Sequence, residues 1–191
     1  MTTAEKTYHH GDLRLAILQA AERKLDEQSI QTLSIRELAR EAGVSAGAPY
    51  HHFGDRDGLL VALASYGFEK LVAAIDAAPV GDLGAKVGAY VNFARDHRAL
   101  HNLMFSDAAD DADDSGRLDT SRNLLLTHIR EDLRPEGCDR SDKELNDLAL
   151  AVWCFLHGVC RMCAEEPMEV MTAPDDLQEL IMRSIKALKG R

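Results

Sequence analysis

The fold is decided by residues 34–60, which read SIRELAREAGVSAGAPYHHFGDRDGLL. The first serine and Glu37, three residues later, make the capping-box pattern that starts a short helix. Gly43 ends that helix, because glycine tolerates the left-handed turn at a helix C-terminus. Ser45 is placed to cap a second short helix that ends near His52. Two short helices joined by such a turn predict a helix-turn-helix.

The apolar residues of this segment face a core, whereas the start of its second helix has only small side chains. Apolar residues at helical spacing place one face of the segment in a core; these are Ile35, Leu38, Ala39 and Val44. The second helix begins with the small residues Ser45 to Ala48, so its N-terminus is able to approach a DNA groove closely. Pro49 lies within this helix and removes a backbone donor. We therefore expect the helix to be shortened or tightened near its start.

The rest of the chain is also predicted to be helical, because almost every long segment has helical periodicity and no run has convincing strand alternation. The expected helices are Asp12–Glu27, Ser34–Ala42, Asp55–Ala78, Leu83–Asp96, Ala99–Phe105, Leu118–Leu133, a segment from the capping box of Ser141 and Glu144 to about Glu165, and Pro174 to about Lys189. The first of these has its apolar stripe at Leu13, Ile17, Ala20, Ala21 and Leu25. The fold class is therefore all-α: an N-terminal three-helix module with the helix-turn-helix, followed by a larger helical bundle.

The charge of the chain is unevenly distributed. The chain has 22 Lys+Arg against 32 Asp+Glu, a formal net charge of −10. The first 56 residues hold seven basic and eight acidic residues, and the other 135 hold 15 basic and 24 acidic ones. The acidity therefore lies outside the helix-turn-helix. It predicts weak nonspecific affinity for nucleic acid.

Composition also indicates where the protein works. The N-terminus has no apolar run of the kind that a secretory signal requires. The longest stretch without Asp, Glu, Lys or Arg in the second half, Leu148–Cys160, has 13 residues, fewer than the roughly 20 that span a bilayer. Four cysteines in a chain without such a signal favour reduced thiols. We expect a cytoplasmic protein with no membrane contact.

The densest acidic patch is Ser106–Gly116, which reads SDAADDADDSG and lacks helical apolar periodicity. We interpret this segment as a mobile loop. Its oxygen atoms would suit Ca²⁺, but the alternating ligands and the closing glutamate of an EF-hand loop are missing.

Residues 34–60 resemble the DNA-binding domain of TetR-type transcriptional regulators. The usual pattern of that family is a capped L/S-I-R-x-L-A-x-x-A-G-V-S, then Y-x-H-F and a basic residue that opens a long helix. This chain supplies Ser34-Ile35-Arg36, Leu38-Ala39, Ala42-Gly43-Val44-Ser45, Tyr50-His51-His52-Phe53 and Arg56. The stretch Tyr8–Arg14 resembles the start of the first helix in one branch of the family.

This resemblance implies a ligand-responsive DNA-binding transcriptional regulator, a repressor that a small-molecule effector releases from its operator. The partners would be double-stranded operator DNA and a second copy of the chain in a homodimer. The domains would be residues 1–56 for DNA binding and residues 57–191 for ligand binding and dimerisation. The expected DNA-binding residues are Ser34, Arg36, Ser45, Ala46, Gly47, Ala48, Tyr50, His51 and Arg56.

Within that set, the resemblance assigns phosphate contacts to Ser34, Tyr50, His51 and Arg56. Hydroxyl, imidazole and guanidinium groups are well suited to phosphate oxygens. His52 has two open interpretations, a DNA contact or a packing residue.

The C-terminal part carries a second resemblance. Trp153, His157 and Gly158 resemble the W-H-G signature of one C-terminal domain class of the same family, and Phe93–Phe105 resembles its companion segment. We expect Trp153 and His157 to pack on one helix face, with Gly158 allowing a close helix approach. The expected ligand-binding residues are Phe93, His97, Met104, Phe105, Leu125, His128, Trp153 and His157. The last two helices, apolar over Leu145–Met162 and along a stripe from Leu177 to Leu188, would form the dimer surface.

Alternative functions stay open at this point. The ladder of Cys154, His157, Cys160 and Cys163 would allow metal or redox sensing, although i, i+3 steps on one helix cannot converge on a tetrahedral zinc site. A helical ligand-binding dimer without DNA binding is the other alternative. The sequence has no H-E-x-x-H, P-loop, G-x-G-x-x-G or G-x-S-x-G motif, so we expect no enzyme activity, no cofactor and no metal.

Overall fold

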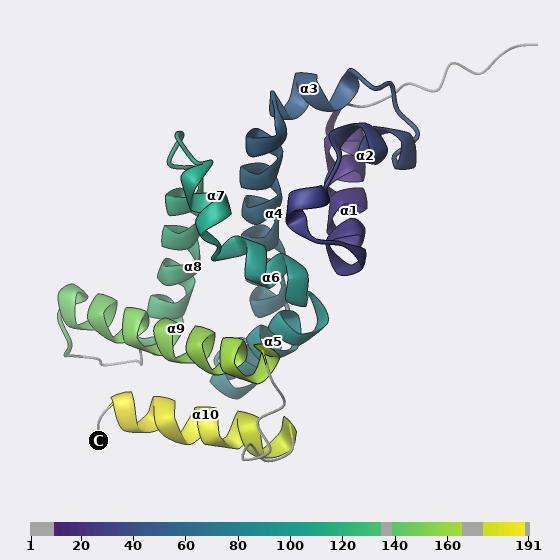
Figure 1. Cartoon of the computed structure of the whole chain (residues 1–191). Coiled ribbons are helices and arrows are strands. Elements are labelled where there is room, and N and C mark those ends of the chain that lie inside the picture. Colours follow the sequence, from purple (N-terminus) through teal and green to yellow (C-terminus); the bar gives the residue numbers. More distant parts are fainter. Residues whose placement is uncertain (1–9, 135–138, 166–173, 190–191) are drawn as a thin grey trace, which may run out of the picture.

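The computed structural model describes residues 10–134, 139–165 and 174–189 (Figure 1). Over these ranges the protein is helical and contains no strand, so the predicted all-α class is confirmed. The elements are α1 (His10–Glu27), the 3₁₀ helix η1 (Ile30–Thr32), α2 (Ile35–Glu41), α3 (Ala48–Phe53), α4 (Arg56–Asp76), α5 (Leu83–Asp96), α6 (Arg98–Met104), α7 (Asp107–Asp111), α8 (Arg117–Leu133), α9 (Asp142–Glu165) and α10 (Pro174–Lys189).

The helices form two groups that share α4. Figure 1 shows α1, α2 and α3 at one end of the molecule, and α9 and α10 side by side at the opposite end. Helix α4 starts beside α3 and runs into the body, where it packs against α5, α6 and α8. The same helix also packs against α1 and α3. Helix α4 therefore joins the two groups, and α1 makes a second connection by packing against α6.

Helix α4 is the one element in the described ranges that is long and apolar enough to cross a bilayer. Its apolar segment is 67% buried inside the protein. The buried side chains include Leu59, Leu63, Phe68 and Leu71, which lie on several sides of the helix. A helix that is apolar all round and surrounded by other helices is a core helix.

The N-terminal helices build their core from the predicted stripe. Ile17, Ala20, Ala21 and Leu25 are buried, while Leu13 is partly buried and packs against the core. Leu38 of α2 is fully buried among them. These contacts fix the orientation of α2 and therefore of the turn that follows it.

The prediction of a mobile loop over Ser106–Gly116 was wrong, because part of this segment is helix α7. The Ser106 hydroxyl caps α7 by accepting a hydrogen bond from the amide of Ala109 at 3.2 Å. Ala109 is fully buried, which anchors the helix to the body. Local capping and one small apolar residue are sufficient for a helix too short to show periodicity.

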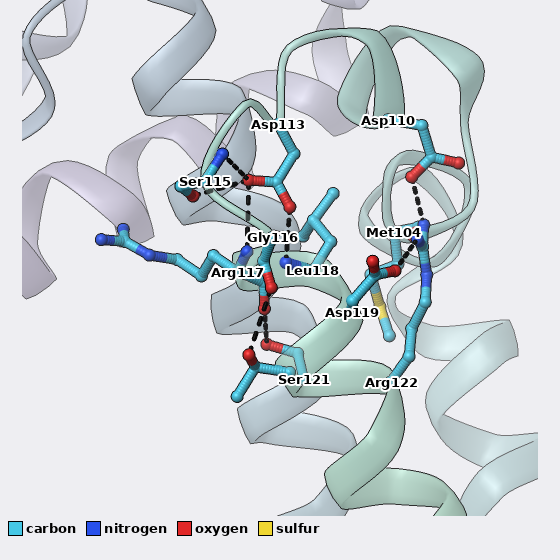
Figure 2. A network of polar contacts seen from close by, with 11 residues as sticks. Met104, Asp110, Asp113, Ser115, Gly116, Arg117, Leu118, Asp119, Ser121 and Arg122 are labelled. Atoms are coloured by element: carbon cyan, nitrogen blue, oxygen red, sulfur yellow. Dashed lines mark hydrogen bonds and ion pairs between the residues drawn. The ribbon is translucent and has the colours of Figure 1, made fainter.

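Figure 2 shows how the carboxylate of Asp113 starts the next helix. Its Oδ2 accepts a hydrogen bond from the amide of Leu118 at 2.7 Å, and its Oδ1 accepts one from the Ser115 hydroxyl at 2.7 Å. Burial alone would raise the pKa of Asp113, but these hydrogen bonds outweigh it and lower the pKa. Asp113 therefore accepts hydrogen bonds from the first two amides of α8, although the N-cap residue of that helix is Gly116.

Arg122 of α8 holds the other side of the acidic segment. Its guanidinium is paired with Asp110 of α7 and lies 3.5 Å from Asp119 (Figure 2). The segment also borders a cleft of about 370 Å³ that opens against the start of α4. The acidic residues thus connect α7 and α8.

Helix α9 has one buried and one exposed face. Leu145, Ala149, Val152, Leu156 and Cys160 face the body. The other side exposes apolar side chains, namely Leu150, which is 48% exposed, and Met162, which is 53% exposed. A Cβ on Gly158 would meet no atom within 4 Å, so the expected close approach to this glycine does not occur among the described residues of one chain.

Candidate functional site

The turn between α2 and α3 has the predicted geometry. Gly43 has φ 69°, the left-handed region that L side chains rarely adopt. The amide of Val44 donates to the carbonyl of Ala39 at 2.9 Å, and the Val44 side chain packs against the core. This turn sets the angle between the two helices.

The two predicted serine caps of this segment are wrong. Ser34 occupies the N-cap position of α2 but makes no side-chain capping hydrogen bond there. Ser45 does not start the second helix, because α3 begins at Ala48 after Gly47. The predicted box of Ser141 and Glu144 is confirmed, with the Ser141 amide donating to Glu144 at 2.8 Å.

Pro49 explains why α3 starts late. It lies in the first turn of the helix, where a missing backbone N–H has no consequence and its fixed φ favours helix initiation. The expected shortening of this helix is therefore confirmed. Ser45 and Ala46 lie in the turn instead, and their backbone is exposed before the helix begins.

The residues predicted to contact DNA lie at the outer end of the molecule. They come from the start of α2, the turn, α3 and the start of α4 (Figure 1). Arg36, Ser45, Ala46, Gly47, Tyr50 and His51 are exposed, whereas Ser34, Ala48 and Arg56 are partly buried. Phe53 faces inward and is buried, so it anchors α3 to the core while Tyr50 projects outward.

Arg56 has an internal partner that the sequence did not indicate. Its Nη2 donates to the carbonyl oxygen of Ile30 at 2.6 Å and ties the start of α4 to η1. Asp55, directly before it, caps α4 by accepting from the amide of Gly58 at 2.9 Å. Any phosphate contact by Arg56 would use its remaining N–H groups.

Gly58 is a site residue that sequence reasoning missed. A Cβ at this position would lie 1.9 Å from the carbonyl oxygen of Phe53. The chain therefore passes directly over the first turn of α4 as it leaves α3. A glycine in the first turn of a long helix is the only hint of this crossing in the sequence.

A polar junction links α1 to the body. Glu22 of α1 accepts a hydrogen bond from Lys70 of α4 at 2.7 Å, and Nδ1 of His97 lies 2.8 Å from the same carboxylate oxygen. His97 lies between α5 and α6, so three parts of the chain meet at one carboxylate. The structure does not place this histidine in the group around Trp153.

The expected ligand-binding residues divide into a central group and outlying ones. Phe105, Trp153 and His157 come together, with the Phe105 ring 4.1 Å from that of His157 and 6.0 Å from that of Trp153. Phe93, Met104 and Leu125 are buried in the core. His128 lies elsewhere, with its Nδ1 3.2 Å from the Asp76 carboxylate at the end of α4.

Two further rings join the central group, and sequence reasoning missed both. The His101 ring lies 5.3 Å from that of His157, and the Tyr90 ring packs edge-on against His101 at 5.9 Å. Both residues lie in or beside the companion segment, at helical spacing from Phe93 and Phe105, which is the signal that could have found them. We call Tyr90, His101, Trp153 and His157 the aromatic cluster.

The aromatic cluster contains polar atoms that have no hydrogen-bonding partner in the described part of the chain. These buried atoms are the Tyr90 hydroxyl, Nε2 of His101, Nε1 of Trp153 and Nδ1 of His157. Burial raises the pKa of Tyr90, and the nearby Trp153 side chain opposes that rise. The Tyr90 hydroxyl and the indole Nε1 of Trp153 nevertheless do not form a hydrogen bond with each other. Native proteins rarely leave several such atoms together unsatisfied.

Burial also keeps the histidines of the aromatic cluster neutral. It lowers the pKa of His101 to about 4, and the electrostatic effects of the neighbouring His157 and Arg161 lower it further. Burial and Arg161 lower the pKa of His157 as well. Both imidazoles are therefore uncharged at pH 7.

This depressed pKa predicts a loss of stability in acid. The unfolded chain takes up a proton at His101 near pH 6.5, whereas the folded chain resists it down to about pH 4. The free energy of unfolding should therefore fall across that window, by roughly 3 kcal/mol from this residue. Urea unfolding at several pH values should show a smaller fall in His101→Leu. Equal acid sensitivity in the variant and the wild type would contradict the prediction.

Cys154, Cys160 and Cys163 are the cysteines that would take part in metal or redox sensing. Cys154 is exposed, whereas Cys160 is buried. The side chain of Cys163 lies outside the described residues. Among the described residues, no three His, Cys, Asp or Glu side chains come close enough to hold a metal ion.

Two family models match successive parts of the chain. The model described as bacterial regulatory proteins, tetR family, matches residues 17–63. The model described as Tetracyclin repressor-like, C-terminal domain, matches residues 83–188, more than half of the chain.

Curated relatives match over different lengths. The HTH-type transcriptional regulator PksA of Bacillus subtilis (strain 168) is 26% identical over 201 residues, which covers 96% of this chain and 93% of the relative. The HTH-type transcriptional repressor Rv1474c of Mycobacterium tuberculosis is 37% identical over 65 residues. That match spans only 34% of this chain and 35% of the relative.

Solved structures share the whole architecture. A protein with unknown function from Rhodococcus sp. RHA1 is 31% identical, with a TM-score of 0.67 and 97% of both chains covered. A tetR-family transcriptional regulator from Streptomyces coelicolor has a TM-score of 0.69 and covers 93% of this chain and 80% of its own, at 17% identity. With both family models matched in sequence order, the chain belongs to the TetR family of bacterial regulatory proteins.

Proposed function

We propose that this protein is a homodimeric DNA-binding transcriptional repressor that a small-molecule effector releases from its operator. The observation that carries the proposal is the outward face of α3. Tyr50 is 45% exposed and His51 is exposed, while Phe53 holds the same helix in the core. The small, exposed residues before α3 let this end of the helix approach a groove without steric hindrance.

We assign DNA binding to residues 1–56 and effector binding with dimerisation to residues 57–191. The exposed apolar side chains of α9, with Leu188 of α10 at 45% exposure, lie at the far end from α3. Dimerisation through this end would leave both copies of α3 free to reach separate half-sites, roughly 34 Å or more apart. We propose a regulatory rather than an enzymatic role, in the cytoplasm.

The junction at Glu22 supports a route from effector to DNA. Lys70 and His97 hold α1 against α4 and the α5–α6 corner. An effector that binds better to a conformation with a different α4 position would move the two DNA-binding modules out of register. Induction then follows from a shift between two populations of the dimer.

DNA binding is tested directly by a gel-shift titration on DNA upstream of the protein's own gene, at several salt concentrations. Tyr50→Phe should weaken binding roughly tenfold on every DNA sequence, because it removes one hydroxyl contact to phosphate and no base contact. The salt dependence should stay unchanged, since the lost group is uncharged.

Tyr66→Phe is the matched control, because it removes a hydroxyl from α4 away from α3. It should bind DNA like the wild type. If the wild type shows no salt-dependent shift on any DNA, the alternative of a ligand-binding dimer without DNA binding holds. If Tyr50→Phe binds like the wild type, the phosphate contact is wrong.

A further inference from the structure

We propose that the aromatic cluster binds an uncharged hydrogen-bond acceptor, such as a ketone or lactone carbonyl, on an otherwise apolar effector. This inference rests on the proposed function, since it names the chemical class of the effector. It draws on three features of the structure: unpaired polar atoms, apolar walls and a cavity that shares a residue with the cluster.

The unpaired atoms have no hydrogen-bonding partner within the described ranges, which leaves them available to a ligand. Four polar atoms from α5, α6 and α9 are buried there without a hydrogen bond. His101 is only 2% exposed and Tyr90 only 1%, so bulk water does not satisfy them. Each such group costs stability until a partner arrives. The indole N–H of Trp153 is a donor only, so the matching group is an acceptor.

The surroundings of the cluster favour an apolar body for the ligand. Phe105 is in ring contact with both histidines and with Trp153, and its ring also lies 5.3 Å from that of Phe68. Phe68 and the neighbouring Met104 are buried. A ligand in contact with these side chains gains from apolar burial rather than from further hydrogen bonds.

The charge of the site favours an uncharged ligand. The two histidines are neutral at pH 7, and Tyr90 holds its proton. Arg161 lies nearby, and its Nη1 donates to the side chain of Asn102 at 3.0 Å. Bringing a carboxylate into a cluster of neutral rings would cost its hydration. A carbonyl oxygen carries no such penalty.

A small cavity beside Tyr90 would hold part of the apolar body of the ligand. It has a volume of about 30 Å³, and its walls include Tyr90, Val87, Ile129, Val152 and Leu156. The ion pair of Lys86 with Asp132 lies on the same wall, with both side chains mostly buried. The cavity would hold a water molecule or two, whereas ligand pockets reach several hundred Å³.

This small volume links binding to regulation. An effector fits only if α5 moves away from α8 and α9, which line the other walls of the cavity. Helix α5 leads directly to His97, the residue that holds Glu22 of α1. Occupation of the cluster would therefore disturb the junction between body and DNA-binding module.

The chain contains its own reporter for this site. Trp153 is the only tryptophan in the sequence and belongs to the cluster. We would titrate the full chain with 2-heptanone and 2-undecanone, and in parallel with heptanoate and undecanoate, while following tryptophan fluorescence. At least one ketone should give a saturable change at a concentration about tenfold lower than the carboxylate of equal chain length.

Tyr90→Phe should weaken ketone binding about five- to tenfold without loss of folding, because the deleted hydroxyl has no hydrogen-bonding partner among the residues that the structure describes. Tyr66→Phe is again the matched control and should bind ketone like the wild type. Saturable binding of the carboxylates in preference to the ketones would overturn the uncharged class. No saturable response to either ketone, or wild-type affinity in Tyr90→Phe, would overturn the site.

Operator DNA in the gel-shift assay separates this inference from the proposed function. Tyr90→Phe without ligand should bind DNA like the wild type and need more ketone for release. If the ketone binds but the wild type never binds DNA, the proposed function fails and the ligand site stands. If DNA binding follows the prediction and ketone binding does not, the ligand site fails alone.

Discussion

Replacing Gly58 with alanine is expected to reduce operator binding to the nonspecific level and to destabilise the protein. The new Cβ would lie 1.9 Å from the carbonyl oxygen of Phe53. A carbonyl at a helix end cannot rotate away as a flexible side chain would, so the turn between α3 and α4 must shift. We expect a loss of about 3 kcal/mol in the free energy of unfolding. A displaced α3 loses its base contacts, which corresponds to a loss of roughly 1,000-fold in operator affinity.

Gly47→Ala is the control for the stability measurement. Gly47 lies at the start of α3 with φ −83°, and a Cβ there would meet no atom within 4 Å. Urea unfolding of this variant should match the wild type. A Gly58→Ala chain with wild-type stability and operator affinity would show that α3 does not cross the start of α4 in this way.

Replacing Gly158 with arginine is expected to separate the proposed homodimer into monomers that remain folded. Within one chain, the position has open space around its Cβ. An arginine in a helix is also more favourable than glycine by about 1 kcal/mol. In a dimer built on this face, however, the new side chain would lie between two helices beside Leu150 and Cys154. Loss of the second half-site contact should lower operator affinity about 100-fold or more.

Sedimentation measures the dimer, and urea unfolding measures the fold. Val80→Arg is the control, because Val80 lies between α4 and α5 and is fully exposed. It should sediment as a dimer and bind operator DNA like the wild type. If Gly158→Arg is dimeric with normal affinity, the dimer surface lies elsewhere on the molecule.

Hydrophobic periodicity, together with capping residues, glycines and prolines, predicted most of the helices, because each long helix buries a stripe of its own apolar residues. The range of α5 was predicted without error, and Pro174 opens α10 as expected. Short elements were harder. Helix α7 depends on a serine cap and on the burial of one alanine, Ala109, and neither leaves a periodic signal.

Side-chain direction was harder to predict than helix position. Ser34 and Ser141 stand in the same sequence pattern, yet only Ser141 forms its capping box. His97 and His157 both appeared suited to a ligand pocket. The structure directs His97 to Glu22, a partner 75 residues away in sequence, and no local rule contains that pairing. Resemblance to a family located the module, while tertiary contacts decided what each residue touches.

The sharing of α4 between the two parts limits how such a chain can recombine. One continuous core includes Ile17 of α1, Leu63 and Phe68 of α4, and Ile185 of α10. A chimera joined in the exposed connection after α4 would keep α4 with its own DNA-binding module. The same helix would then have to pack against α5, α6 and α8 of a different protein. A chimera joined before α4 would break the contacts of Arg56 with Ile30. Combining the DNA-binding module of one such protein with the helical body of another therefore requires coordinated changes along both faces of α4.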